Sequence, residues 1–168
     1  MAFTKKLIKN KKQMKKLLAV LLIAFSLNGF AQQKELVWHT DVNKAINLSV
    51  QSGKPLFLFF TGSDWCGWCT QLQNAVFVKP EFKTWAKKNV ILVELDFPKR
   101  KKLDPKIQQQ NNTLKQQMGR MGFPTIWFVT PEVTAGKVTL KKLDKLGTSR
   151  TVTVNSWIEN ANRILKNK

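Results

Sequence analysis

Two cysteines separated by two residues, Cys66 and Cys69, are the side chains of this sequence best suited to covalent chemistry. A cysteine thiolate attacks disulfides and also binds soft metals, so this spacing fits either redox exchange or half of a metal site. A four-ligand metal site would need two more ligands, and His39 is the only histidine in the sequence. A structural disulfide across two residues closes a very short loop and stabilises little. The spacing therefore favours a redox pair that works without a metal or another cofactor.

Tryptophans flank both cysteines, in the order Trp65, Cys66, Gly67, Trp68, Cys69. Two tryptophans at a turn are costly to expose without a use, which makes an inert cysteine pair a poor alternative. We predict that Trp65 and Trp68 contact a substrate. A serine hydrolase is also disfavoured, because the sequence has a single histidine and no nucleophile elbow.

The segments around the cysteines predict how they are positioned. Residues 55–61 form a continuous apolar run, which is typical of a strand buried on both faces. A polar turn follows, and the cysteine motif then begins a helix that reaches about residue 76. The first turn of a helix stabilises an anion through its free N–H groups and dipole. Cys66 is therefore predicted to be the attacking thiolate, and Cys69, one turn later and more sheltered, to resolve the mixed disulfide.

The rest of the sequence alternates helices with strands. We predict the other helices over residues 41–51, 81–88, 106–118 and from an Asn155 cap to residue 165, and the other strands over residues 90–95, 124–130 and 137–146. Two of these helices have clear end signals, with Thr40 or Asp41 and then Asp104 as N-caps. This order predicts a three-layer α/β fold with a mixed central sheet flanked by helices. Reactive groups in such folds lie beyond the carboxyl ends of the strands.

The N-terminus has the pattern of an export signal. Residues 17–27 are an apolar run that follows a pair of lysines and precedes small residues at a typical cleavage position. Spanning a bilayer takes ~20 apolar residues, so we expect no stable membrane anchor. We predict that residues 1–31 are a cleavable signal peptide, with Met14 as the true start. Residues 32–168 would then form one domain that is periplasmic or otherwise exported, where disulfides persist.

Two motifs make the sequence resemble the thioredoxin superfamily. Residues 61–69 are similar to the active-site stretch of exported bacterial thioredoxin-like proteins, and residues 122–125 (Gly-Phe-Pro-Thr) open a later strand. The resemblance covers roughly residues 38–165. It implies a thioredoxin-like fold in which Pro124 is cis and faces the two sulfurs. It also implies that the backbone of Phe123 binds an extended substrate segment.

The sequence departs from that family at two positions. Thioredoxins keep a buried aspartate six residues before the first cysteine, where this sequence has Phe60, so Glu94 and Asp96 are candidate proton acceptors for Cys69. Trp68 also replaces the usual proline between the cysteines. Asp64 is predicted to be an exposed turn acid, and His39 a structural or exposed residue.

Charge is the remaining signal. The sequence has 29 Lys and Arg against 10 Asp and Glu, and removal of residues 1–31 leaves 22 against 10, a net charge of +12. No basic stripe alternates with aromatic residues, so nucleic acid is not an expected partner. We expect a solvated lysine-rich surface, which includes the basic run at residues 99–102.

Two functions of different classes fit these observations. The first is a monomeric thiol-disulfide oxidoreductase, most simply a reductase, which exchanges disulfides or dithiols with client proteins and is regenerated by a redox partner. The second is a non-catalytic thioredoxin-fold module whose tryptophan-lined surface holds a partner protein.

Overall fold

A mixed five-stranded β-sheet is the centre of the fold in the computed structural model, which describes residues 35–166. The spatial order of the strands is β1-β3-β2-β4-β5. Strands β1, β3 and β2 run parallel, and β4 and β5 are antiparallel to their neighbours. The strands are β1 (Trp38–His39), β2 (Leu56–Thr61), β3 (Ile91–Asp96), β4 (Thr125–Thr134) and β5 (Lys137–Leu146).

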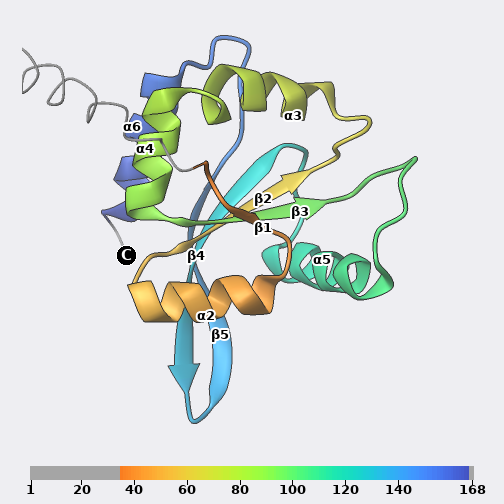
Figure 1. The fold of residues 1–168 in the computed structure, drawn as a ribbon, viewed down its shortest axis with the longest axis vertical. Helices are drawn as coiled ribbons and strands as arrows, with labels where there is room; N and C mark the ends of the chain where they lie inside the picture. Colours follow the sequence, from red (N-terminus) through yellow and green to blue (C-terminus); the bar gives the residue numbers. More distant parts are fainter. Residues whose placement is uncertain (1–34, 167–168) are drawn as a thin grey trace, which may run out of the picture. The chain divides into compact units, whose positions relative to one another are not determined.

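Helices cover both faces of this sheet (Figure 1). One face packs against α3 (Gly67–Leu72), the π-helical turn η2 (Gln73–Phe77), α4 (Pro80–Asn89) and α6 (Val154–Leu165). The other face packs against α2 (Val42–Ser52) and α5 (Pro105–Met118). The predicted three-layer α/β fold with a mixed sheet is confirmed.

The central strand β2 is buried along its whole length, as its apolar run predicts. Alternate side chains point to opposite faces of a strand, and in β2 this divides the residues between the two cores. Phe57 and Phe59 lie in the core under α3, α4 and α6. Leu58 and Phe60 lie in the core under α2 and α5.

The helix ends follow the sequence signals with one exception. Asp41 accepts hydrogen bonds from the N–H groups of the first turn of α2, and Asp104 does the same for α5. The prediction that Asn155 caps the last helix is wrong. Thr153 is the N-cap of α6, and its side chain and that of Ser156 form a reciprocal capping box.

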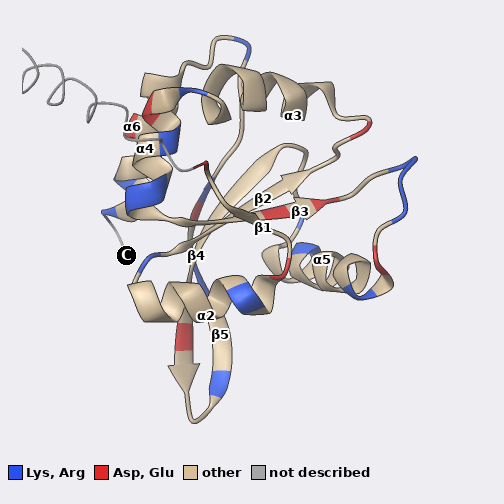
Figure 2. Ribbon diagram, viewed as in Figure 1, with Lys and Arg blue, Asp and Glu red and all other residues tan. Residues whose placement is uncertain are grey.

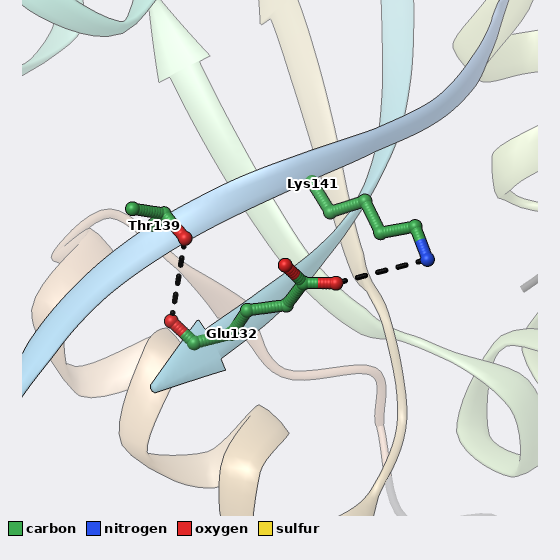
Figure 3. A network of polar contacts seen from close by, with 3 residues as sticks. All are labelled: Glu132, Thr139 and Lys141. Carbon is green, nitrogen blue, oxygen red and sulfur yellow. Dashed lines mark hydrogen bonds and ion pairs between the residues drawn. The ribbon is translucent and has the colours of Figure 1, made fainter. Parts of the chain in front are cut away.

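Strands β4 and β5 form a long hairpin at the edge of the sheet, and β5 has the bounds predicted from the sequence. The hairpin carries two exposed polar contacts (Figure 3): Lys141 Nζ lies 3.7 Å from Glu132 Oε1, and the Thr139 hydroxyl donates to the Glu132 backbone carbonyl at 3.5 Å. Its turn, at Ala135 and Gly136, lies at the opposite end of β4 from Pro124.

The predicted export signal and the Met14 start fall outside the described residues. Among residues 35–166, none of the helices has the length and apolar content that a membrane span requires. The described residues 36–166 belong to one compact unit. A single domain over residues 32–168 stays a prediction.

Candidate redox site

The cysteine pair lies between the end of β2 and the start of α3, where the sequence predicted it. Cys66 is the N-cap of α3, and its Sγ accepts a hydrogen bond of 3.2 Å from the backbone N–H of Cys69. The two sulfurs are joined in a disulfide. Cys66 is 7% exposed and Cys69 only 1%, so the first sulfur is the one nearer to solvent.

A tight turn brings the chain from β2 to Cys66. The backbone N–H of Cys66 donates to the Gly62 carbonyl at 2.9 Å, and the Trp65 indole folds back over the turn. A Cβ atom on Gly62 would lie only 2.5 Å from Trp65 Nε1, so this close approach requires glycine. The same indole nitrogen donates to the Phe97 carbonyl at 2.8 Å. The turn before Cys66 is therefore attached to the loop after β3.

Asp64 strengthens that attachment. Its carboxylate accepts hydrogen bonds from the backbone N–H groups of Lys99 (2.9 Å), Arg100 (2.8 Å) and Lys101 (3.1 Å). These bonds, the one from Lys99 foremost, hold the pKa of Asp64 below its ordinary value. Asp64 is partly exposed, but the prediction of a simple turn acid misses this role. Its partners lie 35 or more residues away in the sequence.

Aromatic side chains surround the cysteines on the surface. Trp65 is 40% exposed and Trp68 is 45% exposed. The Trp65 ring packs edge-on against Phe123, with 5.5 Å between the ring centroids. The Phe123–Pro124 peptide bond is cis, as the resemblance implies. The structure thus brings Phe123, from the start of β4, beside the residue that precedes Cys66.

The two candidate proton acceptors have different surroundings. Both lie on the face of β3 that carries Leu92, which is the face that α3 covers. Asp96 accepts hydrogen bonds from the Ser63 N–H (2.8 Å) and the Ser63 hydroxyl (2.6 Å), so its carboxylate fixes the turn. Glu94 is half-buried. Burial, and then the negative charge of Asp96, raise the pKa of Glu94, while the Lys101 charge opposes this.

Thr61 is a residue that sequence reasoning missed. Phe60, which matches the buried aspartate of thioredoxins by sequence spacing, lies in the core on the face away from the cysteines. Strand alternation places Thr61 on the cysteine side, opposite Asp96 in the parallel register. Its hydroxyl is fully buried and has no hydrogen-bond partner among residues 35–166. The alternation of side-chain direction along β2, with Thr61 as the one polar residue of the strand, was the signal that could have identified it.

Because the Thr61 hydroxyl is buried and unpaired, Thr61→Val is expected to raise the free energy of unfolding of the oxidised protein by about 1 kcal/mol. The matched control is Thr125→Val, which removes a hydroxyl that donates to the Gly122 carbonyl at 2.7 Å. That variant is expected to lose about 1 kcal/mol. Urea unfolding under non-reducing conditions measures both changes. Equal destabilisation by the two substitutions would contradict the assignment of Thr61 as unpaired.

Comparison with known proteins agrees with this geometry. Residues 42–147 match a family described as Thioredoxin-like domain. The chain is 40% identical over 89 residues to the disulfide bond reductase DsbH of Chlamydia pneumoniae, which covers 53% of this chain and 54% of DsbH. It is 34% identical over 107 residues to the thioredoxin-related protein DsbJ of the same organism, covering 61% of this chain and 31% of DsbJ.

A solved structure of a DsbH oxidoreductase superposes with a TM-score of 0.67 at 32% identity, covering 80% of this chain and 87% of that chain. The chain spans about half the length of the curated DsbH sequence that it matches. The family match includes β2, the cysteine pair and the cis proline. From its sequence match, its sheet and its paired cysteines, the chain belongs to the thioredoxin-like family.

Proposed function

We propose that this chain is an exported protein-disulfide reductase. The observation that carries the proposal is the hydrogen bond from the Cys69 N–H to Cys66 Sγ at the start of α3. In the reduced protein the same N–H group and the helix dipole favour a thiolate at Cys66, because both place positive charge beside it. The similarity to a protein named disulfide bond reductase supports reduction as the direction of transfer.

The reaction is a pair of sulfur displacements. The Cys66 thiolate attacks one sulfur of a client disulfide, so that a Cys66–client bond forms, the client disulfide breaks and one client thiolate leaves and takes a proton. The Cys69 thiol then loses its proton and attacks Cys66 Sγ, which releases the second client thiolate. Two electrons have passed to the client, and the protein is left with the disulfide seen between Cys66 and Cys69. A redox partner that supplies two electrons must reduce it again.

The surrounding residues position the client. Trp65 and Trp68 are exposed on either side of Cys66 and offer apolar contact. Phe123 and Pro124 provide the neighbouring edge, along which an extended client segment is expected to lie. The protein acts as a monomer on client disulfides or dithiols. Residues 1–31 direct it to the periplasm or another exported location.

Glu94 is the better candidate for accepting the Cys69 proton. Its carboxyl is half-buried and lies on the face of the sheet that α3 covers. Its pKa is raised by burial and by the negative charge of Asp96, which makes it a stronger proton acceptor than an ordinary carboxylate. Asp96 is a poorer acceptor because its two oxygens already accept hydrogen bonds from Ser63.

The reduction of insulin by dithiothreitol tests the proposed function. The wild-type chain without residues 1–31 is expected to accelerate the precipitation of insulin chains well above the rate with dithiothreitol alone. A chain that folds, binds proteins through its tryptophans and gives no acceleration would instead be a non-catalytic binding module.

Glu94→Gln tests the acceptor. We expect the second-order rate of insulin reduction to fall by at least about tenfold at neutral pH, since a positioned base contributes at least that much.

Glu94→Gln is also expected to change how the free energy of unfolding depends on pH. The folded pKa of Glu94 lies above the ordinary 4.5, so the contribution of Glu94 to stability is complete below pH 4.5 and is lost as pH rises from there through the folded pKa.

The glutamine variant lacks this decline, so its free energy of unfolding should gain on the wild type between acid and neutral pH. Urea unfolding at several pH values measures this difference. Glu132→Gln, on the exposed hairpin, is the matched control and should change neither the rate nor the pH profile. An unchanged rate in Glu94→Gln together with the altered stability profile would show that Glu94 is buried but is not the acceptor.

A further inference from the structure

Three aromatic rings form a continuous strip from the cysteine pair toward the loop after β3. Trp65 packs against Phe123 at 5.5 Å, and Phe123 packs against Phe97 at 5.4 Å between ring centroids. Trp65 directly precedes Cys66, and Phe123 directly precedes Pro124. We call these three rings the aromatic strip. A segment that reaches Cys66 from this side must cross it.

Two lysines lie over the aromatic strip. Lys99 Nζ is 4.4 Å from the centroid of the Trp65 ring. Lys115 Nζ is 5.1 Å from the centroids of both Phe97 and Phe123. Ammonium groups in these positions are close to all three rings of the aromatic strip. The surface beside the cysteines is thus both apolar and positively charged.

The loop that carries Lys99 is anchored and does not depend on a partner for its position. Asp64 binds three consecutive N–H groups of this loop, and the Trp65 indole donates to the Phe97 carbonyl. A preorganised charged surface loses less conformational freedom on binding than a mobile one. Figure 2 shows the resulting stretch of basic residues between β3 and α5.

Positive charge exceeds negative charge in these two segments. The turn 62–66 and the loop 97–102 together contain four basic side chains and one acidic side chain, Asp64. The Asp64 carboxylate already accepts hydrogen bonds from three backbone N–H groups, so the turn offers the lysine side chains no free acidic partner.

A hollow of about 480 Å³ lies beside the aromatic strip and is lined in part by Phe97, Lys99 and Lys102.

From this arrangement we infer that the client presents carboxylates next to its reactive sulfurs, and that Lys99, Lys102 and Lys115 bind them. This inference rests on the proposed reductase function. Complementary charge increases the rate at which two proteins meet in the correct orientation. An acidic protein segment fits better than a membrane surface, because the lysines contact the rings that flank the cysteines and because a client must reach the nearly buried Cys66.

Two synthetic peptides test the inference. Both contain the same short disulfide loop, which is flanked by aspartates in one peptide and by lysines in the other. With dithiothreitol as the reductant, the wild-type protein is expected to reduce the acidic peptide at least about tenfold faster at low salt, as electrostatic steering predicts. The preference should shrink between about 0.01 M and about 0.15 M salt, as the Debye length falls from about 30 Å to about 8 Å.

A charge-inverted variant and a matched control identify the side chains. Lys99→Glu/Lys102→Glu is expected to abolish or reverse the preference for the acidic peptide. Lys88→Glu/Lys137→Glu changes the net charge equally on exposed residues, one at the end of α4 and one at the turn of the β4–β5 hairpin. Both sites lie at the end of the sheet away from Cys66, so this control should keep the preference (Figure 1).

Each result decides the inference. Equal rates on the two wild-type peptides, or a preference that survives in Lys99→Glu/Lys102→Glu, would overturn it while leaving the reductase intact. If that variant instead loses binding to phosphatidylglycerol vesicles and the wild type shows no peptide preference, the lysines serve a membrane surface and the inference is wrong. If neither peptide nor insulin is reduced at all, the proposed function fails first.

Discussion

Cys66→Ser is expected to slow insulin-disulfide reduction by at least about a thousandfold, which is the order of loss when an enzyme loses its nucleophile. A serine hydroxyl does not attack disulfide sulfur, because the reaction needs a thiolate. The fold should survive the change. Cys66 is the N-cap of α3, and serine is among the best N-cap residues, so its oxygen can accept the Cys69 N–H in place of the sulfur. The insulin precipitation rate with dithiothreitol measures the loss.

Cys69→Ala is the companion variant, and it should fail at a different step. Its Cys66 thiolate still attacks, but no neighbouring thiol releases the client, so a mixed disulfide accumulates. Non-reducing electrophoresis is expected to show this species with Cys69→Ala and not with Cys66→Ser. Acceleration of insulin reduction by Cys66→Ser at the wild-type rate would remove Cys66 from the mechanism.

Phe57→Ala is expected to lower the free energy of unfolding by about 3–5 kcal/mol. Phe57 is fully buried in β2 and lies at the centre of an aromatic cluster. Its ring centroid is 5.5–5.9 Å from those of five neighbours, Trp38, Phe77, Phe82, Phe128 and Trp157. These five rings come from β1, β4, η2, α4 and α6, so a cavity here loosens the layer that carries the cysteines. Domains are typically stable by only about 5–15 kcal/mol, so such a loss removes a large part of the total.

Urea unfolding followed by tryptophan fluorescence measures this change. Val133→Ala is the matched control, because its side chain is 56% exposed on the hairpin and its truncation should cost less than about 0.5 kcal/mol. A cost for Phe57→Ala as small as that of the control would mean that the rings around Phe57 repack without a cavity.

The sequence predicted most of the fold because its strongest signals are local. The apolar run of β2, the Asp41 and Asp104 caps and the cysteine motif each depend on residues that are neighbours in the chain. The N-cap position of Cys66 follows from the same local pattern. Strand β1 was missed because it has two residues, too few for any periodic pattern to show.

The features that sequence reasoning missed depend on contacts between segments far apart in the chain, or on a helix end or strand face that differs by one or two residues from the predicted one. Asp64 binds a loop 35 residues further along the chain, and no pattern around it indicates that partner. Thr153 caps α6 instead of Asn155, two residues further on, since both residue types are good caps and only geometry decides between them. The identity of the side chain that faces Cys69 depends on which face of β2 each residue occupies, which spacing from the cysteine alone does not give.

The three N–H groups around the Asp64 carboxylate also determine how this surface responds to acid. Since the folded pKa of Asp64 lies below the ordinary 3.8, its contribution to stability is complete above that pH and is lost only as the pH falls through the lower folded value. In the exported location proposed above, the protein would meet whatever acidity its surroundings impose, without the buffering of the cell interior. In a medium that has fermented to a pH of about 5, well above the ordinary aspartate pKa, the lysine loop and the entrance to Cys66 should therefore keep the same relative position as at neutrality.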